Sequence, residues 1–348
     1  TIEICDAVTQ FSNTYLWILF AIGVPGNVLT IITTLSMQAL SPATFFIALL
    51  AFFDGSALVV KLIFQQLYRY EVQIGNVGCK MEFLTMYLAT VANWMLVLIC
   101  AERFISVCYP LKKISVFTKK RGYICAATVA AFFLCFYGIL FVVMRDKGPG
   151  MTCGTNNNFL SFWATYWYWL NAAMFLFIPF IIILVFTGGI IRGLYLSRRD
   201  RRFLMQKGSG RDTGNECATG NNQRLVAESE RIERAITIMM ILAAVLFVAF
   251  ALPACVFRLL SDPKFRGDCD TIANAYWAMF EQVQFLLVDL THVLNFFMYF
   301  FAVRRFRSQL FKLLRCKTCK KVKYQHTISS QLSSSTKANS TVCLQHIH

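Results

Sequence analysis

Ionisable side chains inside long apolar stretches are the residues of this chain whose types and spacing could carry chemistry. Asp54 lies in the middle of one such stretch, and Glu102 and Arg103 stand side by side near the end of another. A charged group in an apolar environment requires a partner or a function. Asp54 is therefore either a lone buried acid in its neutral form or part of an ion or water site, and intramembrane acids favour the second interpretation.

Enzymatic chemistry finds little support in the sequence. No nucleophile with a base, no set of zinc ligands and no phosphate-binding loop stands out. His292 is the one histidine within an apolar stretch and stands alone there. Cys316 and Cys319 would be half of a zinc site, but no second pair of ligands has suitable spacing. We therefore expect no catalytic residue, no metal site and no enzyme.

The elements that must position these residues are membrane spans. Of the 348 residues, 57% are hydrophobic and only 15% are charged, an apolar surplus that a bilayer absorbs in spans of about 20 residues. Seven stretches are long enough, at 15–37, 43–67, 81–108, 123–144, 165–191, 235–260 and 273–302. The chain is therefore predicted to be an all-α membrane protein.

The net charge of +16 is mostly a topology signal. Of the 34 Lys and Arg residues, 25 fall in the connection 109–122, the connection 192–234 and the tail from 303 onward. These three segments lie on one side of a seven-span chain, and the excess of basic residues predicts that this side is cytoplasmic. The carboxyl terminus is then cytoplasmic and the amino terminus extracellular, and no nucleic-acid partner is expected.

The chain divides into four parts on this basis. Residues 1–14 would be an extracellular amino-terminal segment and residues 15–302 the bundle, with a flexible cytoplasmic loop at about 197–230 that is polar and rich in Gly and Asn. Residues 303–314 place apolar side chains on one helical face with cations opposite, which predicts an amphipathic helix on the inner leaflet. Residues 315–348 would be a cytoplasmic tail, in which Cys316 and Cys319 are candidates for palmitoylation.

The order of residues along the seven stretches resembles the rhodopsin-like (class A) G-protein-coupled receptors. In that family the third helix ends in an acid, an arginine and an aromatic residue, which here are Glu102, Arg103 and Phe104, followed by Pro110. Other residues match further markers of the family: Gly26, Asn27, Leu50, Asp54, Pro179, Phe247, Pro253, Asn295, Tyr299 and Phe306. The resemblance covers nearly the whole chain and implies a seven-transmembrane helix bundle with a short amphipathic eighth helix.

Two departures from the family pattern concern activation. Phe296 replaces the usual proline after Asn295, a form similar to that of some invertebrate peptide (FMRFamide-like) receptors, and it weakens the expectation of a kink there. Phe250 and Ala251 replace the Cys-Trp pair that the family carries before Pro253. Phe247 and Phe250 would then have to supply the side-chain switch of activation.

The resemblance also assigns roles at the inner end of the bundle. Arg103 would be restrained by Glu102 and by Glu233 at the start of the sixth stretch, and its release would open a crevice for a G protein. The alternative is that Glu233 pairs only with an arginine on its own helix. Phe247, Pro253, Asn295 and Tyr299 would complete the activation machinery.

Three further sites follow from the resemblance. Asp54 and Asn295, with Asn27 nearby, would flank a water cluster or a sodium ion, the only candidate for a bound cofactor. Cys79 and Cys153 would form the outer disulfide, and Cys5 and Cys269 are the remaining extracellular pair. The Ser- and Thr-rich tail would bind receptor kinases and arrestin. The outward-facing surfaces of the spans would contact membrane lipids.

The ligand is expected in the outer half of the bundle. Thr85 stands where aminergic receptors carry an aspartate, and Asp289 stands where opsins carry the retinal lysine, so neither a monoamine nor retinal is expected. Residues of both charges and of polar character converge there: Lys61, Glu82, Thr85, Arg258, Glu281, Gln284 and Asp289. Lys61 and Asp289 either form an internal salt bridge or contact the ligand, and these two alternatives stay open.

A pocket with both signs of charge favours a peptide ligand. We therefore expect a plasma-membrane receptor for an extracellular neuropeptide that signals through a heterotrimeric G protein. A chemosensory receptor for a small molecule is the alternative within the fold. A transporter is the alternative outside it, although no internal repeat is visible.

Overall fold

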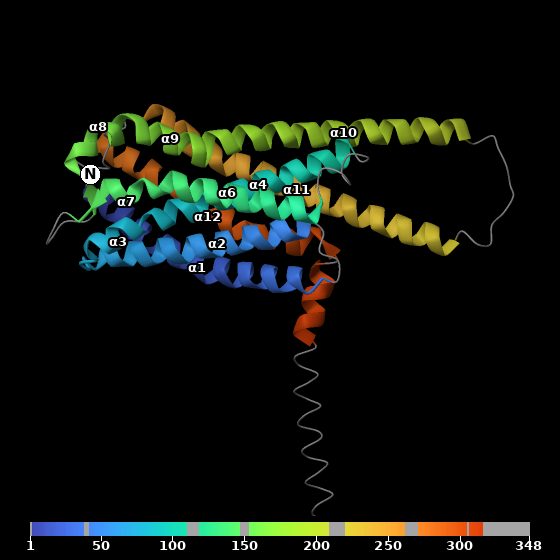
Figure 1. Ribbon diagram of the computed structural model, residues 1–348, viewed down its shortest axis with the longest axis horizontal. Helices are drawn as coiled ribbons and strands as arrows, with labels where there is room; N and C mark the ends of the chain where they lie inside the picture. The colour runs from blue at the N-terminus through green and yellow to red at the C-terminus, as the bar shows by residue number, and fades with distance from the viewer. Residues whose placement is uncertain are drawn as a thin grey trace, which may run out of the picture.

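The computed structural model describes residues 2–37, 42–109, 118–146, 153–208, 220–261, 271–304 and 306–315. Long helices lie roughly parallel in one bundle, and a further helical segment, 306–315, turns away from the bundle axis at one end (Figure 1). The helices and strands in chain order are α1 (Ile2–Leu35), α2 (Pro42–Arg69), α3 (Gly75–Met81), α4 (Phe83–Cys108), α6 (Lys119–Gly138), α7 (Leu140–Val143), β1 (Met144–Arg145), β2 (Gly154–Thr155), η1 (Asn157–Phe159), α8 (Leu160–Phe162), η2 (Trp163–Trp167), α9 (Tyr168–Ala172), η3 (Ala173–Phe177), α10 (Ile178–Gly208), α11 (Gly220–Leu260) and α12 (Ile272–Ala302).

Seven helical segments among the described residues are long and apolar enough to cross a membrane, which confirms the predicted fold class. Several boundaries differ from the prediction, and two of the differences are large. The first helix begins at Ile2, whereas the span was expected from residue 15. The expected loop at 197–230 is helical up to Gly208 and again from Gly220, because α10 and α11 continue past their apolar portions.

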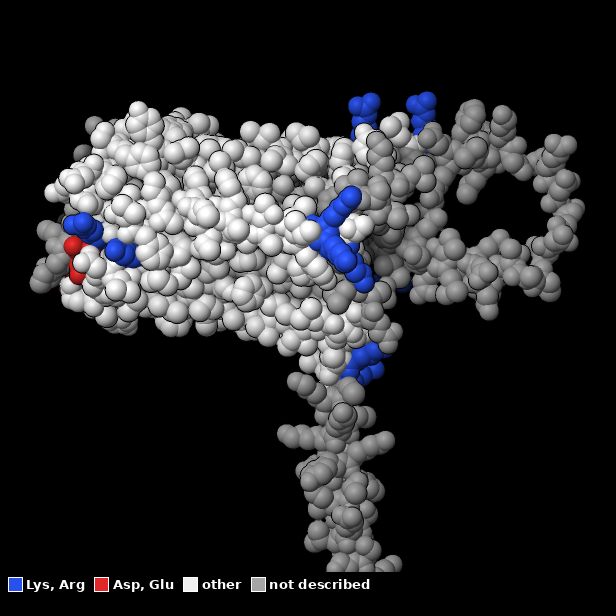
Figure 2. Space-filling view, in the orientation of Figure 1, with Lys and Arg blue, Asp and Glu red and all other residues white. Residues whose placement is uncertain are grey.

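The sides of the bundle are apolar and its ends are polar. Figure 2 shows no charged side chain along the middle of the visible face, and Lys and Arg gather at the end where residues 306–315 lie. Apolar side chains such as Ile18, Ile32, Ile124 and Val185 are exposed on this outer surface. Such a surface suits contact with lipid, where helices satisfy their own backbone hydrogen bonds.

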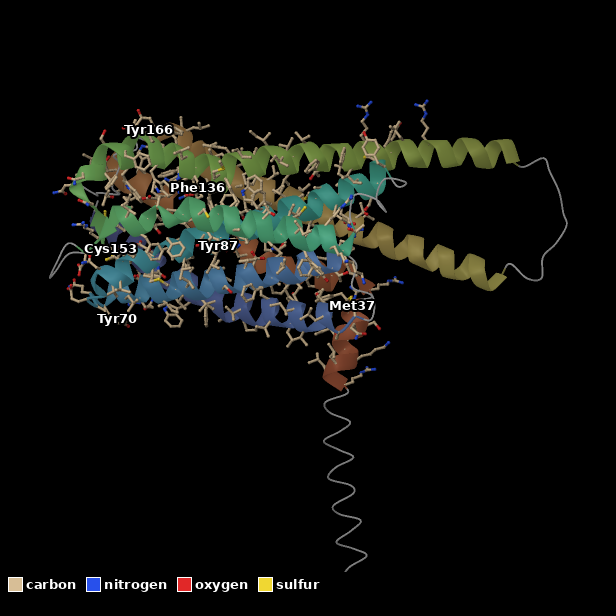
Figure 3. The ribbon with its side chains drawn as sticks, viewed as in Figure 1. Met37, Tyr70, Tyr87, Phe136, Cys153 and Tyr166 are labelled. Carbon is tan, nitrogen blue, oxygen red and sulfur yellow. A yellow bond between two sulfur atoms is a disulfide. The ribbon has the colours of Figure 1, made fainter. Side chains whose placement is uncertain are left out.

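The core of the bundle is built around α4, which contacts α2, α6, α10 and α11. Val91, Met95 and Ile99 of α4 are completely buried, and their spacing of four residues places them on one face of the helix. We call the end of the bundle that carries the amino terminus the outer end and the opposite end the inner end. Near the outer end, an aromatic layer joins α6 to η2, where the ring of Phe136, labelled in Figure 3, stacks on that of Trp167 with centroids 5.3 Å apart.

Side-chain hydrogen bonds fix several helix ends. Thr118 and Thr271 cap α6 and α12, because their hydroxyl oxygens accept from the backbone N–H groups of Arg121 and Asn274. Arg307 donates to the carbonyl oxygens of Phe300 and Phe301 at the end of α12. Gln309 donates to the backbone oxygen of Ser36, so that segment 306–315 is also tied to the end of α1.

Close helix contact at the inner end of α4 depends on glycine. A Cβ atom placed on Gly189 of α10 would lie 2.5 Å from Cε2 of Phe104, whereas a Cβ atom on the neighbouring Gly188 would have nothing within 4 Å. Small residues allow helices in membranes to approach in this way. The aromatic ring of Phe104 therefore packs directly on the backbone of α10.

Gly189→Ala should force Phe104 to move and destabilise the protein by about 1–3 kcal/mol, the usual cost of overpacking a filled site. Gly188→Ala is the matched control and should leave stability unchanged or slightly raised, because alanine favours helix. Thermal unfolding of the purified protein in detergent measures both. Equal melting temperatures for the two variants would contradict the close contact.

Candidate functional site

A cavity of about 300 Å³ opens in the outer half of the bundle. Its walls come from α2, α4, α9, η3, α11 and α12, together with Glu82 at the junction of α3 and α4. Six of the seven residues expected to contact a ligand line it: Lys61, Glu82, Thr85, Arg258, Gln284 and Asp289. Glu281 is not among the lining residues, so the structure brings it less close to the site than its neighbours on α12.

Lys61 and Asp289 form an ion pair across the cavity. Nζ of Lys61 lies 2.7 Å and 2.5 Å from the two carboxylate oxygens of Asp289. Tyr15 of α1 donates a further hydrogen bond of 3.1 Å to Oδ2, and the ammonium also lies 5.4 Å from the centre of the Phe285 ring. Asp289 is buried and Lys61 is half-buried, so the pair joins α2 to α12 and still presents its cation to the cavity.

Arg258 and Glu82 place charges of both signs at the cavity. Glu281 interacts electrostatically with Arg258, and Tyr68 interacts with Glu82. The Arg258 guanidinium lies 5.1 Å from the centre of the Tyr168 ring, a cation–π contact that holds it in place. Among the described residues, neither Arg258 nor Glu82 has an oppositely charged side chain within ion-pair distance. Gln284 lines the same cavity and is buried, and its amide nitrogen has no hydrogen-bond partner. A ligand with both donors and acceptors would complement this wall.

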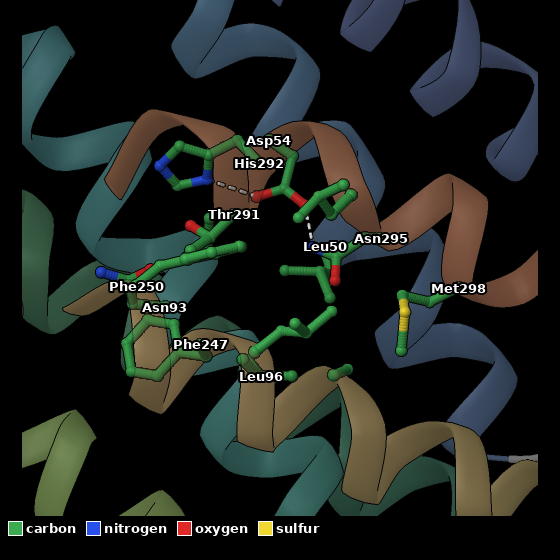
Figure 4. A pocket seen from close by; sticks show the side chains of 14 residues that line it. Leu50, Asp54, Asn93, Leu96, Phe247, Phe250, Thr291, His292, Asn295 and Met298 are labelled. Carbon is green, nitrogen blue, oxygen red and sulfur yellow. Dashed lines mark hydrogen bonds and ion pairs between the residues drawn. The ribbon is translucent and has the colours of Figure 1, made fainter. Parts of the chain in front are cut away.

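Below the outer cavity, Asp54 of α2 is the centre of a buried polar cluster. Its Oδ1 lies 2.7 Å from Nδ1 of His292, and its Oδ2 accepts from Nδ2 of Asn295 at 2.8 Å (Figure 4). Asn27 of α1 donates to the backbone oxygen of His292 at 3.0 Å. The structure thus brings together Asp54, Asn295 and Asn27, as expected, around a residue that the sequence analysis set aside.

His292 links the two cavities of the bundle. It is 3% exposed, and it lines both the outer cavity and a smaller cavity of about 20 Å³ next to Asp54. This role was not expected from the sequence, in which His292 has no catalytic partner and stands alone within its apolar stretch. The available signal was spacing: His292 and Asn295 are three residues apart and therefore share the helix face that meets Asp54.

At the inner end, Arg103 and Glu102 are both buried and form an ion pair, with Nε and Oε2 2.7 Å apart. Ser106 donates to the other carboxylate oxygen of Glu102 at 3.1 Å. Glu233 belongs to α11, but its side chain lies outside the described part of the structure, so the expected contact with Arg103 stays a prediction.

The other expected activation residues lie on α11 and α12. Phe247 is buried and lines the small cavity beside Asp54, and Pro253 lies inside α11. Tyr299 is buried, with its ring centroid 6.0 Å from that of Phe306. α12 runs without interruption from Ile272 to Ala302 through Phe296, whose backbone N–H a proline would lack.

The outer disulfide between Cys79 and Cys153 is confirmed. It joins α3 to the segment before β2, and Cys153 lies at the end of the bundle that carries the amino terminus (Figure 3). Cys5 is disulfide-bonded as well, while Cys269 lies outside the described residues. Cys316 and Cys319, the candidates for lipidation, also lie outside them.

The fifth span is irregular, which its apolar sequence does not indicate. Two π-helical turns, η2 and η3, interrupt it. Side chains of α4 stabilise η3, since Asn93 donates to the carbonyl oxygen of Phe175 and Trp94 to that of Met174. Tyr137 of α6 donates to Oδ1 of Asn171, which lines the outer cavity just before η3. These bonds shape the cavity wall.

Residues 26–288 match the family model described as "7 transmembrane receptor (rhodopsin family)". The chain is 22% identical over 251 residues to the neuropeptide S receptor of Mus musculus, covering 71% of this chain and 66% of the relative. It is 23% identical over 310 residues to the growth hormone secretagogue receptor type 1 of Sus scrofa, covering 85% and 78%. The match thus spans about two thirds of the mouse receptor's length.

Lys61→Met should leave the buried carboxylate of Asp289 without its cation and destabilise the protein by about 1–3 kcal/mol. Adding Asp289→Leu removes the unpaired charge and should restore much of the melting temperature. Lys119→Met, at an exposed position on α6, is the control and should have no effect. A double variant that melts as low as the single one would argue against the ion pair.

Proposed function

The chain belongs to the rhodopsin family of seven-transmembrane receptors, and we propose that it is activated by an extracellular peptide and signals through a heterotrimeric G protein. Membership of this family makes it a receptor and not an enzyme. The observation that carries the peptide proposal is the outer cavity, where Arg258 and Glu82 present opposite charges without an ion-pair partner among the described residues.

A peptide complements such a wall because its backbone and termini supply donors and acceptors at regular spacing. The guanidinium of Arg258 can form two parallel hydrogen bonds to a carboxylate or carbonyl group. Glu82 would accept from a basic or N–H group of the same ligand. Relatives named for neuropeptide S and for growth hormone secretagogues support this ligand class. The closer similarity to FMRFamide-like receptors stays a prediction from Asn295 and Phe296.

The proposed orientation follows from charge. The end of the bundle where segment 306–315 lies, at which Figure 2 shows Lys and Arg side chains, would face the cytoplasm, and the outer cavity would open outside the cell. Residues 306–315 would lie on the inner leaflet of the plasma membrane, with palmitoyl chains on Cys316 and Cys319 as further anchors. The Ser- and Thr-rich tail would serve receptor kinases and arrestin.

The proposed signalling step is a population shift between two arrangements of the bundle. The ion pair of Arg103 with Glu102 supports a closed inner end in the structure described here. A peptide shifts the equilibrium only if it binds the open arrangement more tightly. Release of Arg103 would then expose the surface for the G protein.

A panel of short amidated and free-acid peptides, applied to cells that express the chain with a promiscuous G-protein reporter, tests the ligand class. A saturable response is expected, and Arg258→Ala should raise the half-maximal concentration by about tenfold or more, the loss typical of a central arginine contact. Arg69→Ala is the matched control, because Arg69 is exposed at the end of α2 and does not line the outer cavity. Silence across the panel despite surface expression, with responses to small metabolites, would favour the chemosensory alternative.

Glu233→Ala should raise ligand-independent signalling, because it removes one of the two acids expected to hold Arg103. The measurement is basal reporter activity at matched surface expression. Glu230→Ala, one turn earlier on α11, is the control and should leave basal activity unchanged. Unchanged activity in Glu233→Ala would show that this acid pairs only on its own helix.

A further inference from the structure

The environment of Asp54 differs from that of a cation site. A hard metal cation such as sodium binds through several oxygen ligands. Here both carboxylate oxygens are already engaged by nitrogen atoms, Nδ1 of His292 and Nδ2 of Asn295, at 2.7 Å and 2.8 Å. The amide nitrogen of Asn295 points its hydrogens at the carboxylate of Asp54. Nδ1 of His292 shares a proton with the other oxygen of the same carboxylate. These groups repel a cation at the place where it would have to bind.

The space beside Asp54 is also small. The cavity of about 20 Å³ holds about one water molecule. Its lining combines apolar residues such as Leu50, Leu96 and Phe247 with the polar side chains of Asn93 and Thr291, in addition to Asp54, His292 and Asn295. Asp54 is the only acidic residue in that lining. The residues present therefore do not fit a bound sodium ion.

His292 is held in place from two directions. Its imidazole meets Asp54 of α2, and its backbone oxygen accepts from Asn27 of α1. Both contacts are buried, since Asp54 and Asn27 are each 1% exposed. The ring therefore occupies a fixed position between α1, α2 and α12, where a cation would otherwise balance the buried acid.

The second ring nitrogen of His292 has no partner. Nε2 is buried and makes no hydrogen bond within the structure. Figure 4 shows this nitrogen pointing away from Asp54. His292 also lines the outer cavity, together with Gln284, whose Nε2 is likewise unpartnered. Nε2 is completely buried, so a ligand group in the outer cavity reaches it only if neighbouring side chains of the wall move.

We propose that His292 takes the place of a metal cation at Asp54 and lies beneath the wall of the ligand cavity, where a bound ligand reaches Nε2 after a local shift of that wall. One imidazole ring then connects the two sites, because a ligand group that hydrogen-bonds to Nε2 changes the donor strength of Nδ1 toward Asp54. The first part of the proposal stands on the buried cluster alone. The second part rests on the proposed function, since it requires a ligand in the outer cavity.

The first test uses sodium alone as the probe. The melting temperature of the purified full chain is measured in sodium chloride and in choline chloride at constant ionic strength, and the wild-type protein should show no difference. His292→Ser frees space and supplies an oxygen ligand, so this variant should gain a saturable stabilisation by sodium that Asp54→Asn removes in the same background. Saturable, sodium-specific stabilisation of the wild-type protein, or no gain in His292→Ser, would overturn the proposal.

The second test distinguishes the roles of the two ring nitrogens of His292. It uses the most potent peptide from the panel. Asparagine places its amide nitrogen near the position of Nδ1 but has nothing at Nε2. His292→Asn should therefore keep surface expression and melting temperature close to those of the wild type and weaken peptide potency by about tenfold, the loss of one hydrogen bond in a dry site. Unchanged potency would overturn the contact with the ligand. If no peptide acts on the wild type, the proposed function fails, while the sodium experiment still decides the role of His292 at Asp54.

Discussion

Polar groups inside a membrane protein must find their partners within the protein, and the rest of this structure depends on how one acid meets that constraint. Asp54 is 1% exposed and lies within a span. Water cannot solvate it there, so its stability depends on side chains from other helices. His292 and Asn295 supply them, and Asn27 holds the backbone of His292. One buried carboxylate thus determines how α1, α2 and α12 meet.

The same constraint explains the irregular fifth span. A π-helical turn leaves carbonyl oxygens without their usual helical partners, and in lipid these oxygens must be satisfied by neighbouring side chains. Asn93 and Trp94 of α4 do this for η3. Because Phe175 and Leu176 of η3 line the outer cavity, the side chains that repair the backbone also shape the proposed ligand site.

Buried polar groups that have no hydrogen-bond partner are therefore informative. Several buried polar side-chain atoms of the described residues make no hydrogen bond, and two of them, Nε2 of Gln284 and Nε2 of His292, belong to residues that line the outer cavity from α12. Arg258 and Glu82 likewise lack ion-pair partners among the described residues. Unsatisfied groups in one cavity are what a ligand with donors and acceptors would stabilise, and their arrangement links binding to the helix that also carries Asn295 and Tyr299.

The sequence by itself determined the seven spans and the resemblance to the receptor family, because apolar length and ordered markers along the chain are local information. The resemblance in turn implied the disulfide between Cys79 and Cys153 that the structure contains. It also placed Lys61 and Asp289 opposite each other without deciding between an ion pair and a ligand contact. Only the tertiary structure decided that they pair, that Glu281 lies outside the cavity lining and that His292 bonds to Asp54. These outcomes depend on how α2, α11 and α12 are rotated against one another, and helix rotation is set by packing between segments far apart in the chain.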